Sequence, residues 1–234
     1  MRRTAVPNAE GAGRTRVGVL VFPGSNDDRD LAHALERLGA EVAMVWHKDL
    51  RLPEGVSGVA IPGGFSYGDY LRAGAMARFS PVMRAVEEHA RAGRPVLGIC
   101  NGFQILCESG LLPGGLVRNR DLRFRCLEVA LRVEDLGLFS TEVAPGAELE
   151  IPIKHGSGAY VPDPERSPRV ALRYSGENPN GSVEAIAGVV NEAGNVLGLM
   201  PHPEHAVDPL LGSTDGAPIL RAFLARCTPQ AAAA

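Results

Sequence analysis

The stretch 94–106, Arg-Pro-Val-Leu-Gly-Ile-Cys-Asn-Gly-Phe-Gln-Ile-Leu, constrains the fold of this chain more than any other feature. The apolar run at 96–99 is too short for a helix and is typical of a buried strand. Apolar residues then recur at helical spacing until Gly110. The strand therefore turns directly into a helix, and Cys100 lies at the turn.

Glycines flank this cysteine in the pattern Gly98-x-Cys100-x-Gly102, the thiol counterpart of a nucleophile elbow. They allow a sharp bend and close packing of neighbouring elements. We expect an exposed thiol at the carboxyl edge of a sheet, where a helix N-terminus favours the thiolate. A buried core cysteine is the alternative. The glycines favour the catalytic interpretation, because a plain strand has no use for them.

The N-terminal half has the pattern of an open α/β sheet. Val17–Phe22, Glu41–Trp46 and Val56–Ile61 are apolar runs that predict strands. A helix follows the first of them, and Ser25, Asn26 and Asp27 are all able to cap it. We therefore predict an α/β fold with an open, mostly parallel, doubly wound (flavodoxin-like) sheet.

The C-terminal half shows few helical patterns, so we expect antiparallel additions to the parallel core. Residues 110–119 are interpreted as a turn-rich link. A final helix is predicted at about 217–226. The further strands are expected at Phe124–Val133, Glu148–Ile153, Val170–Tyr174, Gly188–Val190 and Asn195–Met200. The predicted domain spans 16–228, between a disordered tail at 1–15 and a frayed tail at 229–234.

Two details concern the helix that precedes the central strand. Ser80 is predicted to be its N-cap, with Pro81 at the first helical position, and the helix is expected to run towards Ala92. His89 lies beside charged residues in that helix. We therefore expect His89 to be a surface histidine.

Composition excludes several classes of function. The chain has 234 residues and a formal net charge of −3, which argues against nucleic acid or an anionic membrane as the main partner. No apolar run is long enough to span a membrane. The cysteines form no Cys-x-x-Cys pair, so neither a zinc site nor a disulfide framework is expected. These cysteines fit a reducing, cytoplasmic compartment, and they are Cys100, Cys107, Cys126 and Cys227.

A second glycine-rich loop, 62–70, follows the strand that ends at Ile61. Gly63 and Gly64 could present backbone N–H groups to a developing negative charge. An ordinary glycine turn is the alternative. A neighbouring elbow cysteine makes an oxyanion or substrate loop the better interpretation, because ligands meet open α/β sheets at this edge. The loop 154–158, which contains His155, is another candidate.

A cysteine nucleophile needs a base and a group that orients the base. His202 leaves a buried strand between Pro201 and Pro203, which favour an extended backbone. In an extended chain, residues i and i+2 point the same way, so Glu204 could hold the His202 ring. A strand-end histidine satisfied by backbone groups is the alternative.

At this point several motifs resemble those of a known family. Gly98–Gln104 and His202–Glu204 are similar to the nucleophile and base motifs of class I (triad-type) glutamine amidotransferases. Val21–Asn26, Pro62–Arg72 and Gly188–Glu204 narrow the resemblance to the glutaminase subunits of phosphoribosylformylglycinamidine synthases. The similarity runs from about Val17 to the last helix.

The resemblance implies roles for individual residues. Three positions depart from the family pattern at Ala73, Ser157 and His205, and none of them is in the implied triad. The implied roles are Cys100 as nucleophile, His202 as base, Glu204 as its orienter, Gln104 with Gly63 as part of the substrate site, and Gly64 and Asn101 as donors to the oxyanion.

The resemblance also implies partners. The chain has no Gly-Lys-Ser/Thr phosphate loop and no metal-carboxylate cluster that stands out, so no cofactor is expected in it. ATP and magnesium are expected on a large synthase subunit, with a small third subunit in many bacteria. The implied reaction takes ammonia from L-glutamine and converts formylglycinamide ribonucleotide to the amidine, in purine biosynthesis.

Two other classes of function stay open on sequence alone. A stand-alone cysteine hydrolase of the related elbow fold should carry a histidine directly after the nucleophile, whereas this chain has Asn101 there. A non-catalytic α/β binding module would have to treat Cys100, His202 and Glu204 as accidental neighbours.

Overall fold

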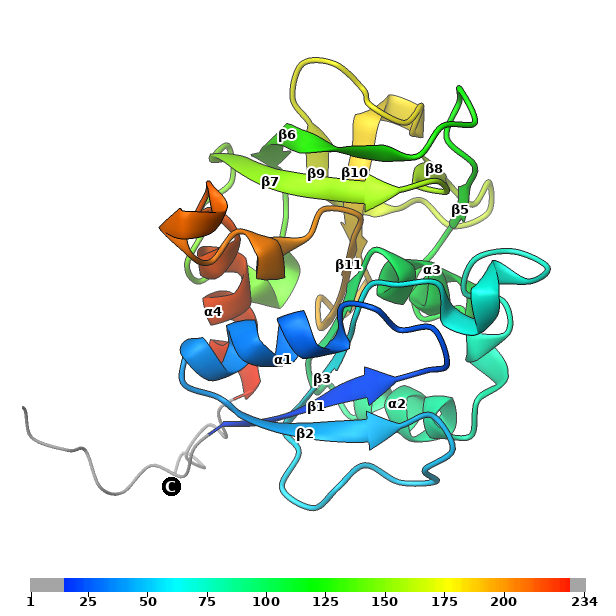
Figure 1. Ribbon diagram of the computed structural model, residues 1–234, viewed down its shortest axis with the longest axis vertical. Helices are drawn as coiled ribbons and strands as arrows, with labels where there is room; N and C mark the ends of the chain where they lie inside the picture. Colours follow the sequence, from blue (N-terminus) through cyan, green and yellow to red (C-terminus); the bar gives the residue numbers. More distant parts are fainter. Residues whose placement is uncertain (1–14, 228–234) are drawn as a thin grey trace, which may run out of the picture.

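A single mixed sheet forms the centre of the computed structural model, which describes residues 15–227 (Figure 1). Within that range it has nine strands in the order β2-β1-β3-β4-β11-β10-β9-β6-β7. In this order the strands are β2 (Glu41–Trp46), β1 (Arg16–Val21), β3 (Gly58–Ile61), β4 (Val96–Ile99), β11 (Val196–Leu199), β10 (Ile186–Val190), β9 (Arg169–Tyr174), β6 (Arg125–Val133) and β7 (Glu148–His155).

The sheet divides into two halves by strand direction. From β2 to β11 all neighbours pair in parallel, and from β11 to β7 all neighbours pair antiparallel. The predicted fold class is therefore confirmed, including the antiparallel additions. The junction lies between β11 and β10, so β11 belongs to both halves.

Helices cover both faces of the parallel half. α1 (Asp28–Arg37) and α4 (Gly216–Cys227) lie on one face, and α2 (Val82–Arg91) and α3 (Asn101–Glu108) lie on the other (Figure 1). Strands β1, β3, β4 and β11 are buried almost throughout, which explains their continuous apolar sequences. The carboxyl ends of β3, β4 and β11 meet at one edge, where the loops that carry the candidate motifs begin.

Four details differ from the expectations. His89 is buried, because its side of α2 faces the core. α2 begins at Val82, and Ser80 does not cap it but contacts the hydroxyl of Tyr67. The predicted link at 110–119 contains β5 (Gly115–Val117), which pairs antiparallel with β8 (Ala159–Val161). Periodicity missed these strands because each is only three residues long.

The tails expected at 1–15 and 229–234 lie outside the described residues, apart from Thr15. No helix within residues 15–227 combines the length and the apolar character that crossing a membrane requires.

Candidate active site

The predicted elbow is present between β4 and α3. Cys100 has φ 50° and ψ −103°, a strained conformation for a residue with a side chain. Its N–H donates to the carbonyl of Leu199 on β11, at 2.8 Å. Gly102 packs against the carbonyl of Ile61, where a β-carbon would collide with the backbone of β3. The glycine therefore permits the close approach of α3 to the sheet that the sequence predicted.

The thiol itself is less accessible than expected. Cys100 is 5% exposed, and its Sγ lies 3.8 Å from the carbonyl oxygen of Lys154. Burial raises the pKa of the thiol, and the charges of Asp27 and Glu204 add to this effect. The backbone N–H of Asn101 and the charge of Lys154 act in the opposite direction but are weaker. The expectation of an exposed thiol is wrong, and burial outweighs the helix N-terminus.

His202 lies beside the elbow because β11 pairs in parallel with β4, with Leu199 opposite Ile99. Its Nδ1 lies 2.6 Å from Oε1 of Glu204, and both side chains are fully buried. The contact was predicted, but its geometric reason was wrong. Residues Pro203–His205 form a 3₁₀ turn, and this turn rather than an extended chain brings the carboxylate back to the ring.

The other ring nitrogen of His202 is in the state a base requires. Nε2 is buried and has no hydrogen-bond partner among residues 15–227. Burial lowers the pKa of His202 to about 3, so the imidazole is neutral at pH 7. With the Nδ1 proton donated to Glu204, the lone pair of Nε2 is free to accept a proton. Burial also raises the pKa of Glu204, to about 7.

The two glycines that follow β3 lie at the same carboxyl edge of the sheet as Cys100 and His202. Gly63 lies against Asp27 and His202, and a β-carbon there would collide with both side chains. Gly64 has φ +142°, and a β-carbon would approach the backbone of residues 24–26 within 2.6–2.9 Å. Within residues 15–227 the N–H of Gly64 has no hydrogen-bond acceptor. It is therefore free to bind an oxyanion, as is expected of such a donor.

Gln104 connects three segments rather than standing alone. Its Oε1 accepts from Nδ2 of Asn101 at 2.8 Å, and its Nε2 donates to the carbonyl of Ser157 at 2.6 Å. Oδ1 of Asn101 in turn accepts from the N–H of Ser66 at 3.2 Å. This chain fixes the loops 62–70 and 154–158 on either side of α3. The geometry gives Gln104 a bracing function beside the substrate role implied by the resemblance.

A small cavity opens above the nucleophile. Its volume is about 60 Å³, which is well below the roughly 300–1,000 Å³ usual for ligand sites. Phe65 and Phe124 lie at its rim with ring centroids 6.4 Å apart. The remaining lining residues are Asn26, Asp27, Gly64, Asp69, Cys100, Gln104, Lys154, His155, Gly156 and Ser157. The cavity is therefore lined by the nucleophile Cys100, by the predicted oxyanion donor Gly64 and by the loop that contains His155.

The sequence analysis missed an ion pair between Asp27 and Lys154, two residues that line this cavity. Asp27, expected only as a cap, makes no capping bond and instead accepts from Nζ of Lys154 at 2.5 Å. Its second oxygen lies 3.7 Å from Nδ1 of His202. The only signal in the sequence was an unused carboxylate after a strand, because Lys154 is distant from it along the chain.

Comparison with known proteins decides the family. Residues 14–217 match the family described as the CobB/CobQ-like glutamine amidotransferase domain. The chain belongs to this family. The amidotransferase is 58% identical over 217 residues to the protein of Rubrobacter xylanophilus named phosphoribosylformylglycinamidine synthase subunit PurQ, and the match covers 90% of this chain and 98% of that protein. A PurQ of Trichormus variabilis is 53% identical, over 89% of this chain and 96% of that protein.

Solved structures agree with this assignment. A chain in the structure of PurLQS from Thermotoga maritima has a TM-score of 0.86 and 45% identity, over 91% of this amidotransferase and 99% of that chain. A glutamine amidotransferase of Thermotoga maritima has a TM-score of 0.63 at 19% identity, over 93% of this amidotransferase and 100% of that chain, which supports the fold alone. The resemblance inferred from the motifs is thus confirmed.

Proposed function

We propose that the chain is the glutaminase subunit of a phosphoribosylformylglycinamidine synthase in purine biosynthesis. It hydrolyses L-glutamine to glutamate and ammonia and passes the ammonia to an ATP-dependent synthase subunit. The observation that carries the chemistry is the free Nε2 of His202, whose Nδ1 is held by Glu204 beside the Cys100 elbow. Relatives of 52–58% identity carry the name of this synthase subunit.

The resting site holds a thiol and a neutral imidazole, since burial raises the pKa of Cys100 and lowers that of His202. His202 takes the thiol proton as the sulfur attacks the side-chain amide carbon of glutamine. The oxyanion then accepts from the N–H groups of Gly64 and Asn101, each contributing about 3 kcal/mol in comparable sites.

The second part of the reaction releases both products. The imidazolium of His202 gives its proton to the departing nitrogen, and ammonia leaves. His202 then removes a proton from water, which attacks the glutamyl thioester, frees glutamate and restores the Cys100 thiol. Glu204 keeps the ring in one tautomer throughout and stabilises the imidazolium when it forms.

Ammonia released into neutral water is protonated and loses its nucleophilicity, so transfer must be direct. We place ATP, magnesium and the formylglycinamide ribonucleotide site on a large synthase subunit, with a small third subunit in the same assembly. The name PurLQS of the Thermotoga maritima structure supports an assembly of several subunits. A cytoplasmic location, expected from the free cysteines, stays a prediction.

The test is glutamate release from L-glutamine, with and without the large synthase subunit, ATP and formylglycinamide ribonucleotide. We expect weak hydrolysis by the chain alone and strong stimulation by the partner, which Cys100→Ala abolishes. Full activity without a partner would favour a stand-alone hydrolase. Unchanged activity of Cys100→Ala in the assembled complex would favour a binding module.

A further inference from the structure

An arginine-rich loop, residues 118–124 between β5 and β6, projects from the same side of the molecule as the candidate site. Every residue of this arginine loop is exposed except Asn119, which is fully buried. The N–H of Leu122 donates to the carbonyl of Asn119, and Leu122 adopts a φ of 59°. The loop is thus a tight turn with one buried anchor.

The charge of the arginine loop is not compensated. Arg125, just after it, is paired with Asp121 at 2.5 Å. Arg118, Arg120 and Arg123 have no acidic partner among residues 15–227. Three unpaired guanidinium groups within six residues form a positive patch on a chain whose net charge is −3. Such a patch attracts an acidic surface.

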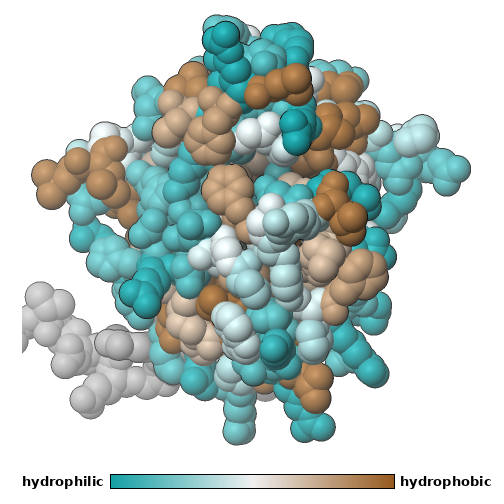
Figure 2. Space-filling view, turned by 45° about the vertical axis from the view of Figure 1, so that its right-hand side comes forward, coloured by the Kyte–Doolittle hydropathy of each residue, from teal (hydrophilic) through white to brown (hydrophobic). Residues whose placement is uncertain are grey.

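Apolar side chains are interspersed with these arginines. Leu122 is 73% and Phe124 54% exposed, and Phe124 also forms part of the cavity rim. Figure 2 shows hydrophobic side chains distributed among hydrophilic ones on this side of the molecule. Arginine and aromatic residues are enriched in protein–protein interfaces. The mixture favours an acidic protein surface over a free anion as the occupant.

Asn119 joins the arginine loop to the wall of the active site. Its Nδ2 donates to the carbonyls of Arg123 at 2.8 Å and of His155 at 2.9 Å. Its Oδ1 accepts from the N–H of Gly158 at 3.0 Å. Its own N–H donates to the carbonyl of Gly156 at 3.0 Å. A single buried side chain therefore clamps the arginine loop onto the loop 154–158.

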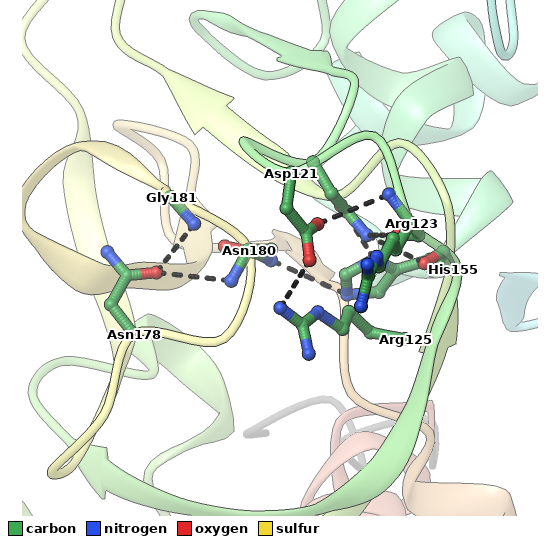
Figure 3. Close-up of polar contacts among 8 residues, drawn as sticks. Asp121, Arg123, Arg125, His155, Asn178, Asn180 and Gly181 are labelled. Atoms are coloured by element: carbon green, nitrogen blue, oxygen red, sulfur yellow. Dashed lines mark hydrogen bonds and ion pairs between the residues drawn. The ribbon is translucent and has the colours of Figure 1, made fainter.

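His155, in the segment 154–158, also forms a side-chain hydrogen bond with Asn119. Burial lowers its pKa to about 4, so the ring is neutral and donates from Nδ1 to Oδ1 of Asn119 at 3.2 Å. Its Nε2 faces Nδ2 of Asn180 at 3.4 Å (Figure 3). The carbonyl of Asn180 also accepts from the N–H of Arg120 at 2.9 Å. The arginine loop is thus fixed to the wall at two points.

The loop 154–158 also contacts Cys100 and Gln104 in the candidate site. The carbonyl of Lys154 contacts Sγ of Cys100, and the carbonyl of Ser157 accepts from Gln104. A displacement of the arginine loop would therefore reach Cys100 and Gln104 through hydrogen bonds of one short loop. The cavity is small and must widen to admit glutamine. A displacement of the arginine loop would therefore affect the access of the substrate to Cys100.

We propose that the arginine loop docks on an acidic surface of the synthase subunit, and that Asn119 is the positioning residue that couples this docking to the loop over Cys100. The inference rests on the proposed function and adds to it the contact surface and the route of stimulation. Docking and coupling are separable, because Arg118 and Arg123 contribute charge whereas Asn119 contributes the clamp.

The docking experiment titrates the synthase subunit into the full-length chain and follows glutamate release. Arg118→Glu/Arg123→Glu is expected to raise the half-maximal partner concentration on the order of tenfold at low salt, with a smaller difference at 0.5 M salt. Hydrolysis without the partner should not change. The control Arg51→Glu/Arg94→Glu alters the net charge equally, at exposed positions in the connections that lead into β3 and β4 and outside the arginine loop.

Stimulation of the unmodified chain with no difference between the two double variants would overturn the docking proposal while leaving the proposed function intact. No stimulation of the unmodified chain would instead overturn the proposed function. Titration of the chain with inorganic phosphate distinguishes an anion site. Saturable phosphate binding that Arg118→Glu/Arg123→Glu abolishes would overturn the choice of a protein partner.

The coupling experiment uses Asn119→Asp, which keeps an acceptor for the N–H of Gly158 and for Nδ1 of His155 but loses the donor to the carbonyls of Arg123 and His155. We expect an unchanged half-maximal partner concentration and a maximal stimulation reduced about fivefold or more. A merely structural role would instead lower the unfolding temperature and the partner affinity together. Asn119→Ser, which adds no charge, serves if Asn119→Asp does not fold. Full stimulation in either folded variant would overturn the coupling.

Discussion

The two halves of the sheet contribute differently to the candidate site. In the parallel half, Cys100 and His202 follow neighbouring strands that are paired in register, so the backbone alone places them together. In the antiparallel half, the segment 154–158 begins with the last two residues of β7, the final strand in the sheet order, and continues into the loop that lines the same site. The reacting groups therefore belong to one half, and a wall of their cavity belongs to the other.

The two halves of the sheet also differ in the interactions that stabilise them. In the parallel half, β1, β3, β4 and β11 are apolar and buried almost throughout, and only the edge strand β2 is largely accessible. The loops of the antiparallel half are held by buried polar side chains, chiefly Asn119, Asn180 and Ser182, whose hydrogen bonds reach several segments. Apolar packing tolerates small changes, whereas a satisfied polar network fails when one member is lost. We therefore expect the loop 154–158, rather than the parallel strands, to change its conformation when one contact is altered.

The largest effect should come from the nucleophile in the parallel half. Cys100→Ala is expected to reduce glutamine hydrolysis by on the order of 10⁴-fold or more, because no other group can form the thioester. The free energy of unfolding should change by about 1 kcal/mol at most, since only one sulfur is lost. Cys126→Ala, an exposed cysteine on β6, is the control. Hydrolysis within tenfold of the unmodified rate would contradict the assigned nucleophile.

The next effect concerns the residue that orients the base. Glu204→Gln is expected to lower kcat by roughly 10²- to 10⁴-fold, because the amide no longer selects the Nδ1–H tautomer of His202. Steady-state kinetics check this, with the exposed Glu192→Gln as control. A small loss would identify Asp27, 3.7 Å from Nδ1, as the orienting carboxylate instead.

Sequence reasoning performed well in the parallel half for a physical reason. Its signals are local: an apolar run, a glycine pair around Cys100, and a carboxylate two residues after His202. Strand register then converts these local patterns into a site without further information. The exposure of Cys100 could not be predicted, because it depends on Lys154 of the other half.

In the antiparallel half the decisive contacts join distant residues. Asn119 and His155 are 36 positions apart, and Asp27 and Lys154 are 127 apart. No periodicity encodes such pairs, and a single sequence shows no covariation. Asn119 therefore looked like the end of a loop, and Asp27 looked like a helix cap.

A smaller effect is expected from the ion pair that links the halves. Lys154 lowers the pKa of the Cys100 thiol, whereas Asp27 raises it. Lys154 also lowers the pKa of His202, whose deprotonation gives the rising limb of the kcat/KM–pH profile, so in Lys154→Ala this limb should move to higher pH. The rate at pH 7 should fall roughly three- to tenfold.

Two further variants isolate the charge effect of this pair. Asp27→Asn/Lys154→Ala should return the profile towards that of the unmodified enzyme, because the opposing charge is removed too. Lys48→Ala, at the other lysine of the chain, should leave the profile unchanged. A profile of Lys154→Ala that does not move would mean that the pair acts on packing alone.

The smallest effect is one of stability and concerns Asp69 in the loop after β3. Its Oδ1 is buried without a hydrogen-bond partner among residues 15–227, and burial raises its pKa to about 6. The folded state therefore binds a proton that the unfolded state has released between its unfolded pKa and about 6, so stability falls as the pH rises through this window.

Asp69→Asn removes this proton dependence and keeps a residue type that tolerates the observed φ of 55°. Because Asp69 is only partly buried, we expect a gain in unfolding free energy of only about 1 kcal/mol at pH 7.5 and none below pH 4. Urea unfolding at both pH values measures this, with the exposed Glu177→Gln as control. An equal gain at both pH values would show that the substitution acts through the backbone, and the loop after β3 would then owe its strain to conformation rather than to a buried charge.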